Sequence, residues 1–239
     1  MAHKLYFYSL IKTQTKIKMK KIFLTAVALV GMISVQAQVK EGSITYNVTA
    51  EGVPAEYAGM LKGMEMTIEF KTGKSRVEFS SPMQSSTTVS DDAGSITLME
   101  MMGQKYFMKL SKADMEKESK KATEPKITYL NETKTIAGYE CKKALIEVKD
   151  QKGEMQKVNV WYTEKIPMSS NGGGKQMAQF KNLKGAPLEF DANQGPIKMT
   201  FAATKVSTAA VADSEFKVST DGYTEMTMDQ LKQMQGGGK

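Results

Sequence analysis

An alternation of apolar and polar residues with a period of two recurs along this chain and limits its possible folds more than any other feature. In the stretch MEMTIEF, the apolar side chains all share one parity: Met64, Met66, Ile68 and Phe70. Successive side chains of a β-strand point to opposite faces, so this pattern predicts a strand with one buried face. Similar runs are separated by turn sequences such as KTGK and DDAG. The chain is therefore expected to form one antiparallel sheet, a sandwich or a barrel.

Three segments interrupt the alternation and are expected to form short helices: 54–63, 111–122 and 224–235. Pro54 suits the first turn of a helix, and the Ser111 hydroxyl suits an N-cap position. The sequence contains no repeat and no linker that would mark a domain boundary. We therefore expect a single β-rich domain over residues 38–239, with a short C-terminal helix and a flexible tail.

The segment before residue 38 has the pattern of a secretory signal. Lys20 and Lys21 precede an uncharged apolar run over residues 22–35, and the residues VQA end it at Ala37. The run is shorter than the ~20 residues that a membrane-spanning helix needs. We expect residues 1–37 to be an upstream extension plus a signal peptide that is removed. The mature chain is then predicted to be periplasmic or otherwise part of the cell envelope or secreted, without a transmembrane segment.

The N-terminal segment also carries the basic imbalance of the chain. Its six lysines belong to the 33 basic residues, whereas all 26 acidic residues lie beyond it, so the remaining chain is nearly neutral. A nucleic-acid partner is therefore not predicted. The only histidine, His3, lies in the same segment, and its loss would exclude Ser-His-Asp and Cys-His catalysis and histidine-ligated zinc. We expect no catalytic residue, no metal and no cofactor.

The only cysteine, Cys141, stands in the stretch GYECKKALIEV. A lone cysteine can be a nucleophile, a metal ligand or a small buried side chain. A reactive thiol needs a lowered pKa, usually from a cation, a helix N-terminus or a histidine. Lys142 and Lys143 are adjacent, but neighbours on a strand point to alternate sides. The pattern favours a packed, unreactive cysteine.

Methionine is unusually frequent, with 19 in the chain and clusters around Met64 and Met99. Thioethers fill irregular cores, and they also suit surfaces that bind varied apolar ligands. One hypothesis is a non-enzymatic protein that binds an apolar or amphipathic ligand, such as an acyl chain, in a Met-rich concave sheet face. The alternatives are a ligand-free interaction module that binds an envelope protein through its sheet edges, and an enzyme with a cleft of perturbed acids. The candidates for lining the ligand groove are Met64, Met66, Ile68, Leu98, Met99, Met108, Trp161 and Tyr162.

The stretches KTIAGYECKKALIEV, VWYTEKIP and LKGAPLEF occur in this order over residues 133–190. They resemble the pattern of domain of unknown function 4412, a family of secreted Bacteroidota proteins that is related to the GLPGLI proteins. This chain departs from the GLPGLI pattern at GAPL, where the second glycine is missing. The resemblance implies the architecture of the periplasmic lipoprotein carriers, an open antiparallel half-barrel or strongly curved sheet with helices across its concave side. It implies no activity, but it assigns a structural role to the matching residues Gly138, Tyr139, Cys141, Pro167, Gly185 and Pro187.

Overall fold

A computed structural model describes residues 39–54, 59, 61–121, 123–149, 153–167, 177, 179–194 and 197–236. Residues Gln38–Lys239 form one compact unit. Half of the helix expected over 54–63 lies outside the described residues, at 55–58 and 60.

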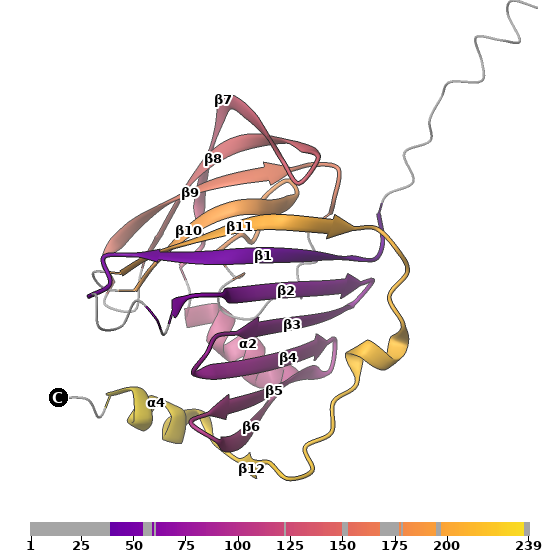
Figure 1. The fold of residues 1–239 in the computed structure, drawn as a ribbon, viewed down its shortest axis with the longest axis vertical. Coiled ribbons are helices and arrows are strands. Elements are labelled where there is room, and N and C mark those ends of the chain that lie inside the picture. Colours follow the sequence, from indigo (N-terminus) through magenta and orange to yellow (C-terminus); the bar gives the residue numbers. More distant parts are fainter. Residues whose placement is uncertain are drawn as a thin grey trace, which may run out of the picture. The chain divides into compact units, whose positions relative to one another are not determined.

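Twelve strands form one sheet (Figure 1). The strands are β1 (Gly42–Glu51), β2 (Met64–Lys71), β3 (Lys74–Ser80), β4 (Gln84–Asp91), β5 (Gly94–Met101), β6 (Gln104–Ser111), β7 (Lys126–Ile136), β8 (Tyr139–Lys149), β9 (Met155–Thr163), β10 (Ala186–Gln194), β11 (Ile197–Ser207) and β12 (Thr224–Glu225). The helical elements are α2 (Lys112–Lys121), the 3-10 turn η3 (Asp213–Phe216) and α4 (Met228–Gly236).

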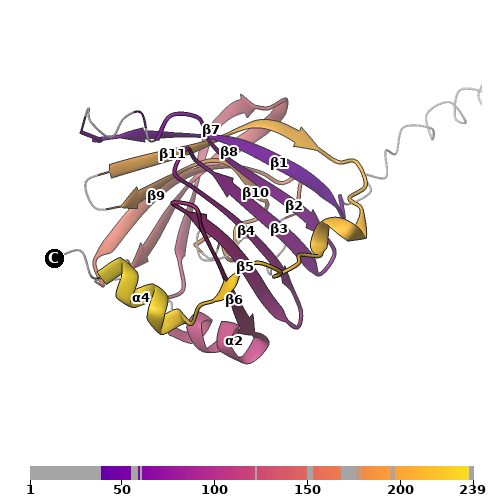
Figure 2. The ribbon, with the colours of Figure 1, turned by 60° about the horizontal axis from the view of Figure 1, so that its bottom comes forward.

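The strand order is β12-β6-β5-β4-β3-β2-β1-β11-β10-β9-β8-β7, and all neighbours are antiparallel except β12 and β6. The two ends of this order do not pair, so the sheet is curved but not closed into a barrel (Figures 1 and 2). This confirms the predicted fold class, a mainly β chain with an open antiparallel sheet and a few short helices.

Tight turns set the register of the hairpins. Met102 and Gly103 both have positive φ angles, 51° and 78°, and join β5 to β6, so Met101 lies opposite Gln104. Ala137 and Gly138 join β7 to β8 in the same way, with φ angles of 47° and 83°. Two positive φ angles match the right-handed twist of the flanking strands, which is why such turns predominate in two-residue hairpins.

One face of the sheet, which we call the inner face, carries the closed core. Tyr46 lies opposite Met66 of β2 and Ala203 of β11, and its hydroxyl donates a hydrogen bond to the Pro187 carbonyl at 2.7 Å. Phe190 stacks on Phe201 with ring centroids 4.7 Å apart. The connection between β9 and β10 covers these rings, because it contributes the buried side chains of Ile166, Phe180 and Leu183. This part of the inner face is thus sealed by the protein itself.

The opposite, outer face is crossed by the segment that follows β11. Arg76 points away from the core, because its neighbour Val77 points into it, and its guanidinium donates to the Glu215 carbonyl at 2.9 Å. Lys71 holds the same segment through the Val211 carbonyl, at 3.0 Å, and the Asp213 carboxylate, at 3.2 Å. The segment therefore packs against β2 and β3 before it reaches β12.

Both α-helices in the described part of the chain, α2 and α4, start at side-chain caps. The helix expected over 111–122 is confirmed as α2, and Ser111 caps it as predicted, accepting from the Asp114 amide at 3.2 Å. Thr227 caps α4 in a reciprocal arrangement with Gln230. The helix predicted over 224–235 starts later, at Met228, because Thr224–Glu225 pairs with β6 instead.

Candidate ligand-binding surface

The strand β5 differs from the core strands because all eight of its residues are half-buried. In β2, by contrast, Met64 and Met66 are each only 2% exposed. Apolar side chains of β5 lie on both faces, with Met99 and Met101 on the inner face and Ile96 and Leu98 on the outer face. Neither face of this strand is fully covered by the described protein.

The inner face around β5 mixes hydroxyl groups with thioethers. The register places Met99 between Ser86 and Tyr106, and Thr97 between Thr88 and Met108. The Thr88 and Thr97 hydroxyl oxygens lie 3.0 Å apart and share a hydrogen bond. We call the following set the inner β4–β6 surface: Ser86, Thr88, Thr97, Met99, Met101, Tyr106 and Met108. Methyl, thioether and hydroxyl groups alternate here, so the surface is amphipathic.

The structure separates the eight residues proposed as a groove lining. Met64, Met66, Ile68 and Tyr162 are at most 6% exposed and belong to the closed core. Trp161 and Leu98 point to the outer face, because their strand neighbours point inward. Met99 and Met108 are left on the inner β4–β6 surface, where Met99 is half-buried and Met108 is 8% exposed. The proposed lining is therefore not one surface: a period of two identifies a covered face but not what covers it.

The hydroxyl residues of β4 were missed by the sequence analysis. The stretch QSSTTVSD carries polar residues on both parities, so its alternation shows no apolar face. Its inner parity holds Ser86, Thr88 and Ser90, which continue the rows of Phe79, Val77 and Ser75 on β3. The sequence did contain an indication of this surface. A polar strand between two apolar strands predicts a polar stripe on the face that the three strands share.

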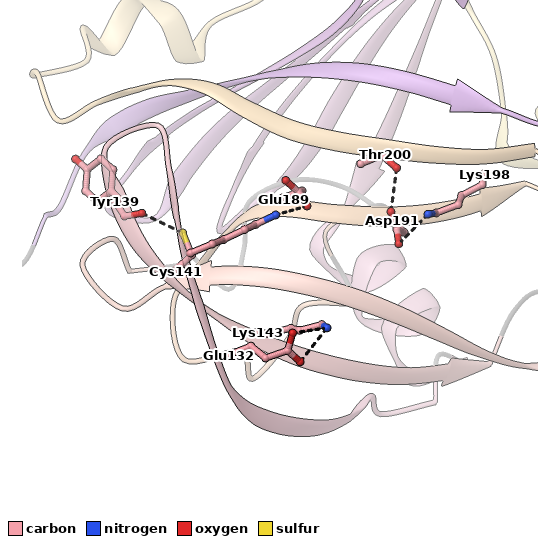
Figure 3. A network of polar contacts seen from close by, with 9 residues as sticks. Glu132, Tyr139, Cys141, Lys143, Glu189, Asp191, Lys198 and Thr200 are labelled. Atoms are coloured by element: carbon pink, nitrogen blue, oxygen red, sulfur yellow. Dashed lines mark hydrogen bonds and ion pairs between the residues drawn. The ribbon is translucent and has the colours of Figure 1, made fainter.

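The outer face of β7–β10 holds a cluster of charged side chains around Trp161, and Figure 3 shows three of them, Glu132, Lys143 and Glu189. The Lys134 ammonium lies 4.4 Å from the indole centroid and 2.6 Å from the Glu189 carboxylate. The Lys143 ammonium lies 5.5 Å from the same centroid and 3.0 Å from Glu132. Each cation thus has both an aromatic and an anionic partner, and the cluster joins β7 to β10. These pairings satisfy the charges within the protein.

Cys141 lies opposite Lys134 on the same parity as this cluster, yet its side chain is fully buried and unpaired with another cysteine. Its thiol donates to the Tyr139 carbonyl, with a sulfur–oxygen distance of 3.5 Å. Burial raises the pKa of the Cys141 thiol to about 11, against the opposing effect of Lys134. A thiol with a raised pKa carries little thiolate at neutral pH and is a poor nucleophile.

We expect Cys141 of the folded protein to react slowly with a thiol reagent at pH 7–9 and rapidly once the chain is denatured. The labelling rate of the folded chain should keep rising with pH up to about 11 instead of levelling off near the ordinary thiol pKa, because the thiol is half ionised only at its raised pKa. Cys141→Ser should lower the free energy of unfolding by about 1–3 kcal/mol. Fast labelling of the folded protein at pH 7 would show a reactive thiol instead.

Other residues of the sequence motif stabilise turns and backbone hydrogen bonds. Gly138 has a φ angle of 83° in the β7–β8 turn, and Pro187 accepts the Tyr46 hydroxyl. The Ala186 amide donates to the Ile166 carbonyl at 2.9 Å, which holds the two ends of the β9–β10 connection together beside Pro167 and Gly185. Tyr139 is half-buried beside the turn.

Partial burial and the nearby Glu215 carboxylate raise the pKa of the Glu69 carboxyl group. Glu69 lies on the outer face, 3.9 Å from the Arg76 guanidinium, which opposes the rise. No group of three or more His, Cys, Asp or Glu side chains that could hold a metal ion occurs in the described part of the chain. In the same residues, no helix is long and apolar enough to cross a bilayer.

The curved open sheet and the motif residues that brace it define a mainly β domain built on one antiparallel sheet. The chain belongs to the family described as Domain of unknown function (DUF4412), which matches residues 41–221. No curated protein matches the chain. A crystal structure described as a beta-barrel-like protein of domain of unknown function DUF1849 from Brucella abortus is similar at 12% identity, over 71% of this chain and 98% of that one, with a TM-score of 0.34. This likeness is too distant to inform on function.

Proposed function

We propose that this chain is a binding protein of the periplasm, cell envelope or extracellular space that holds an amphipathic ligand, with an acyl chain as the apolar part. The ligand lies on the inner β4–β6 surface. The observation that carries the proposal is the half-burial of all eight residues of β5, with Met99 and Met101 on the inner face.

The chemistry of the surface supports an amphipathic ligand rather than a wholly apolar one. Covering apolar area is worth about 25 cal/mol per Å², so partly exposed thioethers favour an apolar cover. Met side chains adapt to varied chain shapes. The hydroxyls of Ser86 and Thr88 lie in the same surface and can bond to a polar head group.

The expected export of the chain supports the location. Residues 20–37 have the charged start, apolar run and small-residue end of a cleaved signal. A protein that carries single-chain lipids in a water-filled envelope compartment needs a site of this kind.

The test is a melting curve with palmitate or a lysophospholipid, each kept below its critical micelle concentration. Ligand at a hundred times its Kd should stabilise the fold by about 2.7 kcal/mol. For a domain of this size, that corresponds to a rise in Tm of roughly 5–10 °C. In Met99→Asp the rise should be lost, because a carboxylate then stands in the surface.

Met102→Asp is the matched control. Met102 is 85% exposed in the neighbouring turn, and aspartate tolerates its positive φ angle of 51°. The same charge is thus added beside the surface but outside it, and the rise in Tm should persist. If neither amphiphile shifts the Tm of the unaltered chain, or if both variants respond alike, the inner β4–β6 surface is not the ligand site.

A further inference from the structure

Among the residues that the structure describes, only the short strand β12 pairs with the outer edge of β6. Met101 and Gln104 flank the two-residue turn and form its hydrogen-bonded pair, so bonding to β5 alternates along β6 from there. The backbone groups of Lys105, Phe107 and Lys109 consequently point away from β5, toward the edge. β6 has eight residues, whereas β12, its neighbour on that side, has two.

A few contacts hold the short strand β12 on this edge of β6. The Met226 amide donates to the Phe107 carbonyl at 2.8 Å, and the Met226 side chain is 5% exposed. The Tyr223 hydroxyl donates to the Glu100 carboxylate at 3.0 Å, and the Lys105 ammonium lies 5.5 Å from the Tyr223 ring. The register shows two faces: Glu225 lies opposite Phe107 on the outer face, and Thr224 lies opposite Tyr106 on the inner face.

The charges of β6 and of the segment around β12 are complementary. On β6, Lys105 and Lys109 flank Phe107 on the outer face, so Glu225 stands in register between two lysines. The segment around β12 also carries Asp221 and Asp229 and has no lysine between them. Acidic residues alternate here with apolar ones, while the edge that receives them is basic and apolar.

The family match ends at residue 221, so β12 and α4 lie beyond the matched region. The matched region alone would leave the whole of β6 as an edge strand. An edge with unpaired amide and carbonyl groups is a template for another strand.

We propose that the β6 edge is a strand-accepting interaction surface. Its partner is a protein that supplies an extended segment with acidic residues on one parity and apolar residues on the other, parallel to β6. In this structure, residues 223–226 occupy the middle of that edge in cis, and the partner segment displaces them. This is β-augmentation, in which backbone bonds supply affinity and alternate side chains supply specificity. The inference is independent of the ligand on the inner face.

The experiment uses a fluorescently labelled peptide with the sequence of residues 219–230 and the full chain with its own segment loosened. Met226→Asp places a charge at the buried anchor, and Tyr223→Ala removes the half-buried anchor at Glu100 without burying a charge. Fluorescence anisotropy should show the peptide binding to both variants at least tenfold more tightly than to the unaltered chain. In hydrogen exchange, bound peptide should protect the amides of Phe107 and Lys109.

Two controls decide the outcome. Met155→Asp changes an exposed methionine of β9, far from β6 in the strand order, and should bind the peptide no better than the unaltered chain. A peptide with Glu225→Lys and Met226→Asp should bind to neither loosened variant. The proposal is overturned if the native peptide also fails to bind to the Tyr223→Ala chain, or if both peptides bind equally. The unaltered chain could instead dimerise at high concentration, with the peptide dissociating the dimer. That result would assign the β6 edge to a second copy of the chain and overturn a foreign partner.

Discussion

Phe190→Ala is expected to lower the free energy of unfolding by about 3–5 kcal/mol, a large share of the stability of an ordinary domain. Phe190 is 1% exposed and meets three aromatic rings, with centroids 4.7 Å away for Phe180 and Phe201 and 5.8 Å away for Tyr46. These rings come from β1, β10, β11 and the β9–β10 connection. The lost ring would therefore leave a cavity at the point where the connection seals the core.

Urea unfolding would measure this loss, with Phe79→Ala as the matched control. Phe79 also faces inward, opposite Met66, but it is only partly buried where the core gives way to the polar inner parity of β4. Its truncation should cost about half as much or less, because solvent already reaches part of the ring. Equal losses in the two variants would mean that the β9–β10 connection does not seal the core around Phe190.

The strands could be predicted because their pattern is local. The alternation in MEMTIEF requires only that one face be buried, and Met64, Met66, Ile68 and Phe70 are all buried in β2. The Ser111 cap could be predicted for the same reason, since capping depends on residues three positions apart. The start of α4 at Met228 could not, because β12 forms only through contacts with β6, more than a hundred residues earlier in the chain.

The candidate site was harder to predict than the fold. The burial of Met64 and Met66 was evident from their parity. The core that they share, however, also includes Phe180 and Leu183, which follow a glycine-rich stretch whose sequence shows no strand or helix pattern. Conversely, the polar residues on the inner face of β4 predict a face in contact with solvent, although Ser90 on that face is only 4% exposed. Whether a face meets solvent, protein or ligand depends on segments distant in sequence, so periodicity alone does not decide it.

Gly185→Ala is the second change with a large expected effect, a loss of about 3 kcal/mol in the free energy of unfolding. A Cβ atom at Gly185 would lie 2.0 Å from the Thr163 carbonyl oxygen and 2.7 Å from its carbon. Both atoms belong to the backbone at the end of β9, where Thr163 is 1% exposed, so no side chain can swing away. Relief requires β9 and β10 to separate where Ala186 pairs with Thr163.

Gly138→Ala is the matched control, because it makes the same chemical change in the same family motif for a different physical reason. A Cβ atom there meets nothing within 4 Å, and only the φ angle of 83° opposes it. The expected loss is about 1–2 kcal/mol, and Gly138→Asn should recover part of it because asparagine tolerates positive φ angles. No side chain should rescue Gly185 in this way, since any Cβ atom clashes. If alanine costs the same at both positions and asparagine improves both, then Gly185 is required for backbone conformation rather than for the close approach of β9.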